Sequence, residues 1–315
     1  MTRVVVVGSF NVDHVWRCDT LPAPGATLAG EYTTGPGGKG FNQAMAARRA
    51  GAGTVFVCSL GSDGGGQLAR ALATADDIDL RDEASDDPTG TAGIFVGADG
   101  RNSIVIGPGA NATLSVAHVE AQASTIRDAR VLLAQLESPI DVVITALQLA
   151  RESGVPSVLN TAPANAETTS ALLGMADVLT PNESEFASLV ARHTAMAIPA
   201  DAVATAGDDA LHLLCRTLHP NGSIVITLGA MGSFVSHADD VMRGDDIAHY
   251  RVAAETANVI DTTGAGDAFN GALCASMVIR PDARFAEHLR FASYYAARST
   301  ESEGAAAAMP VLPVG

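Results

Sequence analysis

Lysine is almost absent from this chain of 315 residues, in which Lys39 is the single lysine. Lysine and arginine together number 19, and all the others are arginines. The 35 acidic residues give a formal net charge of -16 at pH 7. Such a chain has no basic stripe with which to neutralise a phosphate backbone, so we expect no nucleic-acid partner. A bound nucleotide is still compatible with this charge, because it needs only a local pocket.

Cysteines and long hydrophobic runs are also scarce. The four cysteines form no C-x-x-C pair and have no zinc-ligand spacing, which favours free buried thiols in a reducing cytoplasm. They are Cys18, Cys58, Cys215 and Cys274. The first apolar run, 4–7, is too short for a signal peptide, and no run is long enough to span a membrane. We therefore predict a cytoplasmic protein without a membrane partner.

Hydrophobic residues make up 47% of the chain, enough for one large α/β core with a smaller appendage, and we predict a single domain over 1–315. Short β-branched runs alternate with alanine-rich stretches, a pattern typical of a parallel sheet with helices on both faces. The expected strands are 4–8, 54–60, 131–136, 157–159, 178–180 and 224–228. The expected helices are 41–50, 65–73, 139–152, 183–191 and 209–218.

Two segments interrupt this alternation. Residues 13–37 are punctuated by prolines, and residues 91–109 contain two strand-like runs around Asp99-Gly100, which predicts a β-hairpin. Together they are expected to form a small sheet outside the core, and such a sheet beside a cleft would act as a lid. An edge extension of the main sheet is the alternative.

The stretch "VIDTTGAGDAFNG", residues 259–271, has glycines directly before a helical pattern. The spacing of Phe269 and Leu273 predicts a helix that begins near Ala265. The first N–H groups of a helix have no partner within it, its dipole adds positive partial charge there, and glycines let an anion approach. Gly264–Gly266 is therefore a candidate anion hole.

Asp267 directly follows this candidate anion hole. A carboxylate beside a phosphate site makes chemical sense if it takes a proton from the hydroxyl that attacks the phosphate. The alternative is that Asp267 only caps the helix, as aspartates often do.

A second glycine-rich helix entry is "GPGGKGFNQAMAA", residues 35–47. It lacks the spacing of a P-loop and follows no long apolar strand, which argues against a dinucleotide fingerprint. Gly38 and Gly40 would let the backbone reach a polyhydroxylated ligand, and Asn42 can both donate to and accept from hydroxyl groups. The alternative for Asn42 and Gln43 is a solvated first helical turn.

Further polar residues follow predicted strands, where open α/β sheets bind ligands. In "GSFNVDH", Asn11 and Asp13 leave the first strand, and Asp13 is suited to hold a sugar diol through charge-assisted hydrogen bonds. Glu137 in "QLES" and Glu185 in "TPNESE" are acids at strand ends that would order Mg²⁺ through water. Read singly, each of these acids is more often a surface residue.

The segment 224–232, which ends in "ITLGAMG", combines a strand with a Gly-x-x-Gly turn. This pattern suits a nucleotide that passes close to the backbone.

With these five stretches in order, the chain resembles the ribokinase-like (PfkB) carbohydrate kinase family. "GGKGFNQA" and "DTTGAGDAFNGAL" are similar to the two signatures of that family, and the resemblance runs from Val4 to about Gly304. It implies a three-layer α/β/α sandwich with a small β-sheet lid. It also implies ATP-dependent phosphorylation of a sugar, D-ribose at its primary hydroxyl, to give D-ribose 5-phosphate.

The resemblance also assigns roles to particular residues. Asp267 would be the catalytic base, with Gly264, Ala265 and Gly266 as the anion hole. The sugar would contact Asn11, Asp13, Gly38, Lys39, Gly40, Asn42 and Glu137. ATP would contact Asn182, Thr227, Gly229, Gly232, Gly266 and Ser293. Mg²⁺ would lie near Asn182 and Glu185 through water, and potassium near Asp261, Thr263, Ser299, Ser302 and Gly304. The lid sheet would form a homodimer clasp.

Three features depart from the family pattern. Ala308 stands where a serine is usual near the monovalent-cation loop, which puts potassium activation in doubt. The helix "RFASYYAAR" on the adenine side differs from the usual residues, which weakens the assignment of Ser293. No last helix is expected after "MPVLPVG", which would leave the nucleotide side more open.

Three other functions are open at this point. A different sugar or a nucleoside would be a substrate within the same family, and a nucleoside would need room for its base near the lid. A sugar-binding sensor without turnover is a second possibility. A nicotinamide oxidoreductase is disfavoured because no GxGxxG follows the first strand.

Overall fold

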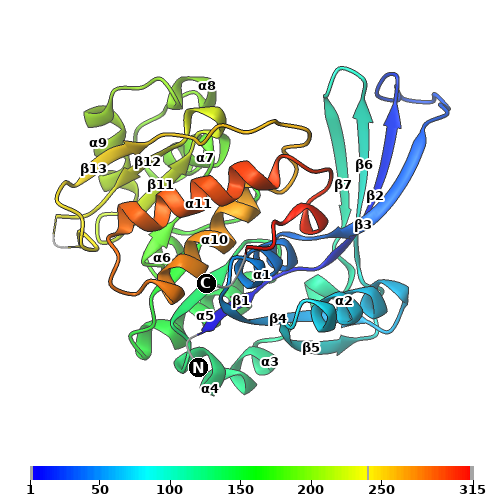
Figure 1. Ribbon diagram of the computed structural model, residues 1–315, viewed down its shortest axis with the longest axis horizontal. Helices are drawn as coiled ribbons and strands as arrows, with labels where there is room; N and C mark the ends of the chain where they lie inside the picture. The colour runs from blue at the N-terminus through cyan, green and yellow to red at the C-terminus, as the bar shows by residue number, and fades with distance from the viewer. Residues whose placement is uncertain (1–2, 240, 313–315) are drawn as a thin grey trace.

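The computed structural model describes residues 3–239 and 241–312, and its centre is a nine-stranded sheet with the order β13-β12-β11-β10-β9-β8-β1-β4-β5 (Figure 1). All neighbouring strands are parallel except the pairs β11–β12 and β12–β13. The strands are β1 Arg3–Val7, β4 Gly53–Gly61, β5 Asp79–Ser85, β8 Val131–Ala134, β9 Ser157–Leu159, β10 Val178–Leu179, β11 Ser223–Thr227, β12 Ser233–Ser236 and β13 His249–Val252. The six expected strands are confirmed, whereas β5, β12 and β13 were not expected.

Helices cover both faces of this sheet, which confirms the three-layer α/β/α architecture. One face carries α1 Lys39–Arg49, α2 Gly64–Ala75, α10 Ala265–Ile279 and α11 Phe285–Ser299. The other carries α3 Val116–Ala121, α4 Ala123–Arg127, α5 Ile140–Glu152, α6 Ser170–Leu173, α7 Glu183–His193, α8 Ala200–Val203 and α9 Asp208–Leu218. Strand β1 supplies both cores, since Val4 and Val6 face one helical layer while Val5 and Val7 face the other.

A separate four-stranded sheet projects from this body, at the upper right of Figure 1, with the order β3-β2-β6-β7. Its strands are β2 Asn11–Cys18, β3 Glu31–Gly37, β6 Gly90–Gly97 and β7 Asn102–Gly107. The expected hairpin is present, and the edge extension of the main sheet is wrong. The small sheet begins at Asn11, because β2 follows almost directly on β1.

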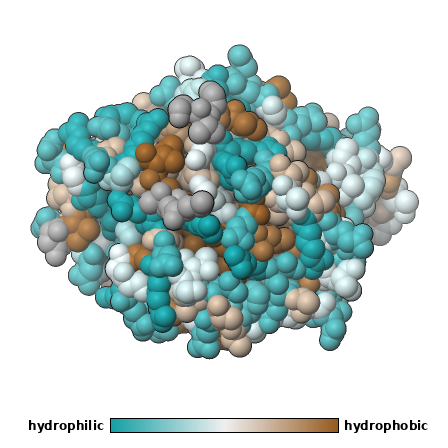
Figure 2. Space-filling model, turned by 60° about the horizontal axis from the view of Figure 1, so that its bottom comes forward, coloured by the Kyte–Doolittle hydropathy of each residue, from teal (hydrophilic) through white to brown (hydrophobic). Residues whose placement is uncertain are grey.

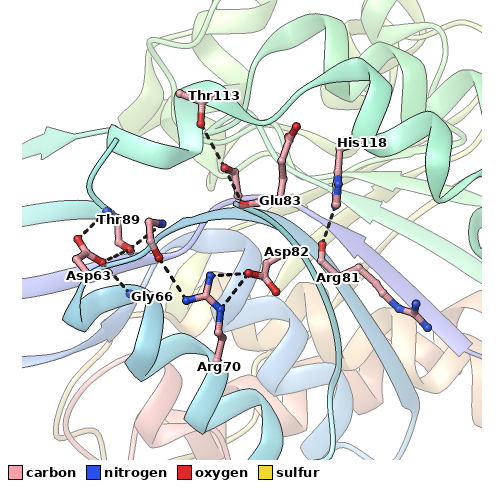
Figure 3. Close-up of polar contacts among 11 residues, drawn as sticks. Asp63, Gly66, Arg70, Arg81, Asp82, Glu83, Thr89, Thr113 and His118 are labelled. Atoms are coloured by element: carbon pink, nitrogen blue, oxygen red, sulfur yellow. Dashed lines mark hydrogen bonds and ion pairs between the residues drawn. The ribbon is translucent and has the colours of Figure 1, made fainter. Parts of the chain in front are cut away.

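Asp63 fixes the base of the small sheet to the main body (Figure 3). Its carboxylate caps α2 by accepting from the Gly66 N–H at 3.0 Å. It also accepts from the Thr89 N–H at 2.9 Å and the Thr89 hydroxyl at 2.6 Å, immediately before β6. Burial raises the pKa of Asp63, but these hydrogen bonds outweigh it and leave the pKa below its ordinary value.

The surface and the thiols agree with the composition. On the face seen in Figure 2, hydrophilic side chains dominate and hydrophobic ones occur in small scattered groups. All four cysteines are free, and three of them are buried.

Within residues 3–239 and 241–312, we find no helix with the length and apolar character needed to traverse a bilayer. In the same ranges, only the short 3₁₀-helix η3, Ala306–Ala308, follows α11.

Candidate active site

The carboxyl end of β1, the start of α1, the end of β8 and the start of α10 meet at one place. The backbone N–H of Lys39 donates to Glu137 Oε2 at 3.0 Å, and Asn42 Nδ2 donates to Asp267 Oδ2 at 2.9 Å. The carboxyl group of Asp13 interacts electrostatically with Glu137, Asp267 and Lys39. Five of the residues expected at a sugar site therefore lie together, and we refer to this cluster of side chains as the candidate pocket.

The start of α1 packs so closely against the backbone that links β1 and β2 that two positions of the stretch 35–47 must be glycine. Gly38 has φ 86°, and a Cβ there would lie 2.7 Å from the Asn11 backbone nitrogen. A Cβ at Gly40 would lie 2.5 Å from the Ser9 backbone nitrogen. Any larger residue would push α1 away from the link between β1 and β2, and so would separate the two halves of the pocket.

Asn11 and Asp13 lie on the same face at the base of the small sheet, because they are two residues apart on β2. Asn11 Oδ1 accepts from Asn111 Nδ2 at 2.8 Å. Asn111 is itself held by the Phe10 backbone, whose N–H and C=O it bonds at 2.9 Å each. Among the described residues Asn11 Nδ2 has no partner, so it is available to a ligand.

Asn111 had no signal in the sequence that connects it with this pocket. It lies in the 3₁₀-helix η1, Gly109–Thr113, and is separated by 100 residues in the chain from Asn11, which it orients. Only the fold brings the two together.

The pocket holds more negative than positive charge. Burial, Glu137 and Asp267 raise the pKa of Asp13 to about 7, while Lys39 lowers it. Burial lowers the pKa of Lys39, but the surrounding carboxylates, led by Asp267 and Glu137, raise it above its ordinary value. Lys39 is therefore a stable ammonium group, and its Nζ has no hydrogen-bond or ion-pair partner within the described part of the chain.

The start of α10 has the form of an anion site. Gly264 adopts the left-handed conformation with φ 75° and precedes the first helical residue. In the described ranges the N–H groups of Gly264, Gly266 and Asp267 have no partner, and Gly266 is exposed. The N–H of Ala265 instead donates to the Thr262 carbonyl at 3.1 Å. The unpaired amides of this conformation are thus those of Gly264, Gly266 and Asp267, and Ala265 does not join them.

The Asp267 carboxylate does not cap α10, so the alternative of a helix cap is wrong. It is buried, and its two oxygens accept from Asn42 Nδ2 and from Gln43 Nε2, both at 2.9 Å. Burial raises the pKa of Asp267, while Lys39 and these two hydrogen bonds lower it, and the net direction is upward. A carboxylate with a raised pKa beside unpaired amides is suited to accept a proton.

Asn42 and Gln43 are both buried, so a solvated first turn is also wrong for them. Gln43 is fully buried, and its amide joins Asp267 to Asn160 and Gln135. No pattern in the chain connects Gln43, Asn160 or Gln135 with Asp267.

On the neighbouring side, Asn182 and Glu185 form a reciprocal capping box at the start of α7. The Asn182 N–H donates to Glu185 Oε2 at 2.9 Å, and the Glu185 N–H donates to Asn182 Oδ1 at 2.9 Å. Asn182 also pairs with Thr227 as an isolated bridge between the ends of β10 and β11. Glu185 is buried and interacts electrostatically with Lys39 and Asp267, so this pair borders the pocket.

The turn after β11 contains Gly229 and Gly232, with φ 52° and 84°. It thus places flexible backbone next to Thr227. Ser293 lies buried on α11, and its hydroxyl makes no hydrogen bond within the described residues. The structure therefore brings Asn182, Thr227 and the glycines together but gives no contact that joins Ser293 to them.

Asp261 ties the loop before α10 to the segment after α11. Its carboxylate accepts from the Thr263 N–H and hydroxyl at 2.9 and 2.6 Å, and from the Gly304 N–H at 3.0 Å. Burial raises the pKa of Asp261, but these bonds hold it below its ordinary value. Ser299 is buried and donates to the Ala296 carbonyl, whereas Ser302 is exposed.

Three or more His, Cys, Asp or Glu side chains placed to hold a metal ion do not occur within 3–239 and 241–312. A cation here would rely on carbonyl, hydroxyl and single carboxylate oxygens, together with water and phosphate. The loop around Asp261 offers oxygens of that kind, which would suit a weakly held potassium ion. The Asn182–Glu185 pair at the start of α7 offers them too, which would suit a hydrated Mg²⁺.

Fold and site together are suited to a protein that binds a polyhydroxylated small molecule and an anion beside a buried base. The model of the pfkB family of carbohydrate kinases matches residues 1–312, and the chain belongs to this family. It is 36% identical over 312 residues to a ribokinase of Haemophilus influenzae, covering 98% of this chain and 95% of that protein.

Two further similarities extend this result. The solved structure of Arabidopsis thaliana ribokinase complexed with ribose and ATP is 30% identical with a TM-score of 0.82, covering 98% of this chain and 96% of that one. A bifunctional ribokinase/ribose-5-phosphate isomerase A of Fructilactobacillus sanfranciscensis is 36% identical over 285 residues, or 89% of this chain. The match spans 49% of the length of that protein.

Proposed function

We propose that this kinase transfers the γ-phosphoryl group of ATP to the primary hydroxyl of D-ribose and releases D-ribose 5-phosphate. The observation that carries the proposal is the buried Asp267 carboxylate next to the unpaired amides of Gly264 and Gly266. The similarity to ribokinases, one of them solved with ribose and ATP, supports the choice of sugar and phosphate donor.

In the proposed mechanism, Asp267 takes the proton of the sugar hydroxyl as its oxygen attacks the γ-phosphorus. A new O–P bond forms, the bond to ADP breaks, and the proton stays on the carboxyl group. The amides of Gly264 and Gly266 face the charge that develops on the phosphoryl oxygens, where fixed dipoles lower the barrier most.

The pocket around Asp13 would hold the sugar. Asp13 would accept hydrogen bonds from a diol, Asn11 Nδ2 would donate to a hydroxyl oxygen, and Lys39 would offset the surrounding carboxylates. The remaining contacts that we propose are Gly38, Gly40, Asn42 and Glu137. Because the pKa of Asp13 is about 7 without ligand, sugar binding should weaken as the pH falls below 7.

ATP would lie along the ends of β10 and β11. Asn182, Thr227, Gly229 and Gly232 border this place, and we keep Ser293 as a proposed adenine contact. The open side of Gly266, where a Cβ would have no neighbour within 4 Å, leaves room for the phosphoryl group between nucleotide and sugar.

Two cations belong to the proposal. Mg²⁺ would be held through water near Asn182 and Glu185, and potassium near Asp261, Thr263, Ser299, Ser302 and Gly304. When bound, they would supply positive charge to the phosphates. If the residue at 308 matters for potassium, Ala308→Ser should increase the activation by potassium relative to sodium.

We further propose a cytoplasmic homodimer that pairs through the small sheet, which would also act as a lid over the sugar. The face of the sheet that begins at Asp13 continues with Val15 and Ile94 towards Ile104 and Ile106 on edge strand β7. Ile104 and Ile106 are 51% and 46% exposed. Ile104→Glu should convert the dimer to a monomer in light scattering, whereas Leu213→Glu on α9, which also replaces an exposed aliphatic side chain with glutamate, should not.

The test of the proposed function is ADP release from ATP-Mg²⁺ with a panel of pentoses, hexoses, 2-deoxy-D-ribose and nucleosides, each with and without potassium. Selective turnover of D-ribose supports the proposal. Preferred turnover of a nucleoside or another sugar would keep the mechanism and replace the substrate. Sugar binding by calorimetry without any turnover would favour the sensor instead.

A further inference from the structure

Gln43 uses every polar atom of its side chain in the interior of the protein. It lies on α1 with 0% exposure. Its Nε2 donates to Asp267 Oδ1 at 2.9 Å and to Asn160 Oδ1 at 3.0 Å. Its Oε1 accepts from Gln135 Nε2 at 2.5 Å. Burying a glutamine amide costs free energy unless its polar atoms form hydrogen bonds, and both the nitrogen and the oxygen of Gln43 do so.

The neighbours of Gln43 lock the orientation of its amide. Asn160 Nδ2 donates to the Thr180 carbonyl at 2.8 Å, so Asn160 must turn its oxygen towards Gln43. Gln135 presents its NH₂ group to Gln43 Oε1. If the Gln43 amide were reversed, its oxygen would face both the Asp267 carboxylate and the Asn160 oxygen. Gln43 is therefore fixed as a hydrogen-bond donor to Asp267.

Asn42, the other donor to Asp267, is held differently. Its Nδ2 donates to Asp267 Oδ2 at 2.9 Å, but its buried Oδ1 has no hydrogen-bond partner among the described residues. Within 3–239 and 241–312, that single hydrogen bond is what fixes the direction of the Asn42 amide. The two donors thus make the two carboxylate oxygens unequal: Oδ1 is tied through Gln43 to Asn160 and Gln135, and Oδ2 is bonded to Asn42, one of the residues proposed to contact the sugar.

We propose that Gln43 is a positioning residue for the base: its locked N–H bond holds Asp267 Oδ1 and thereby presents Oδ2 to the sugar hydroxyl. The proposal rests on the function proposed above. In the transfer step the hydroxyl proton passes to Oδ2, while the hydroxyl oxygen forms the bond to phosphorus and ADP leaves.

The same bond favours the ionised form of Asp267. Burial and the nearby Glu137 raise the pKa of this carboxyl, and Lys39 together with the hydrogen bonds from Asn42 and Gln43 acts against that rise. A donor that faces a buried carboxylate stabilises its charged form. When this donor is removed, Asp267 should hold its proton to higher pH, so that less of the enzyme has a free base at neutral pH.

The experiment measures kcat and KM for D-ribose against pH in the wild type and in Gln43→Met, which keeps the length of the side chain but cannot donate. We expect kcat at pH 7 to fall by about 10- to 100-fold, the effect of losing one charge-assisted hydrogen bond. The acid limb of the kcat profile should move to higher pH, and KM should change by less than about threefold, because Gln43 touches no sugar hydroxyl in this account.

Two further variants make the result specific. Gln148→Met, on the exposed side of α5, makes the same substitution away from the pocket and should leave both the profile and kcat unchanged. Gln135→Met removes only the bond that orients Gln43 and should shift the acid limb in the same direction by a smaller amount. A lower melting temperature of Gln43→Met with an unmoved pH profile and normal kcat would overturn the proposal.

A second readout does not depend on turnover. Carboxyl-¹³C NMR of aspartate-labelled protein, with the Asp267 signal assigned from its loss in Asp267→Asn, follows the titration of the base directly. An upward shift of the Asp267 pKa in Gln43→Met supports the role of Gln43, and an unchanged pKa contradicts it. If the wild type phosphorylates no sugar, the proposed function fails, and this titration still decides the role of Gln43.

Discussion

Replacing Asp267 with asparagine separates the chemistry of the site from its structure. The carboxylate accepts two hydrogen bonds, from Asn42 and Gln43, both at 2.9 Å. The new amide has one oxygen, which would stay on Gln43 because that donor is locked by Gln135 and Asn160. Its NH₂ group would then face Asn42, whose Oδ1 has no partner in the described part of the wild-type chain. Rotation of the Asn42 amide therefore restores the second bond.

The magnitude follows from this exchange. Both hydrogen bonds persist, so the free energy of unfolding should change by no more than about 1 kcal/mol. The base, in contrast, is lost. A positioned general base contributes about 10²- to 10⁴-fold, so kcat should fall by that factor, which corresponds to about 3–5 kcal/mol in the barrier. Sugar affinity should stay within about threefold, since the pocket keeps its shape.

The assay compares ADP release at saturating D-ribose, calorimetric ribose binding and thermal unfolding. Asp282→Asn is the matched control, because Asp282 is exposed and is not one of the site residues. It should match the wild type in ADP release, ribose binding and thermal unfolding. Asp267→Ala should unfold more easily than Asp267→Asn, since it leaves two buried donors unpaired at about 1–3 kcal/mol each. If Asp267→Asn keeps a tenth or more of the wild-type kcat, Asp267 is not the base.

Three other outcomes follow from single contacts. Burial lowers the pKa of His237 to about 4. Between about pH 6.5 and pH 4, His237 is therefore protonated in the unfolded chain but not in the folded protein. As the pH is lowered through this range, the free energy of unfolding should decrease by up to about 3 kcal/mol. Urea titrations should show a smaller fall for His237→Gln, and an equal slope would contradict the assignment. Asp63→Ala loses a helix cap and the bonds at the base of the small sheet, which should cost about 1–3 kcal/mol in thermal unfolding; a change below about 0.5 kcal/mol would contradict this. Asn111→Leu frees the amide of Asn11 and should raise the KM for D-ribose about tenfold with little change in kcat, and an unchanged KM would show that Asn11 needs no such support.

The strands that could be predicted were those buried on both faces. Strands β1, β4, β8 and β11 are mainly apolar runs in which nearly every residue is buried. Strand β5 escaped because it is an edge strand whose sequence, DLRDEAS, is half-buried and charged. Strands β12 and β13 have four residues each and extend the opposite edge in antiparallel order, a length at which periodicity carries little information.

The glycine-rich helix entries could be found from sequence because their chemistry is local. A helix start needs glycine at left-handed or tightly packed positions, and Gly38 and Gly264 meet that need. The supporting amides could not be found. Gln43 meets Asp267 across 224 residues and Asn160 across 117, and a separation of that size leaves no pattern in the chain. Only the closed fold makes such partners visible.

The most direct test of the account identifies the product. Wild-type enzyme, ATP-Mg²⁺ and D-ribose are incubated, and ³¹P and ¹H NMR locate the phosphate while ADP is counted. The account predicts one D-ribose 5-phosphate for each ADP released, and a rate lower by about 10²-fold or more in Asp267→Asn. ADP release without phosphorylated ribose, or a phosphate on another hydroxyl of the sugar, would contradict it.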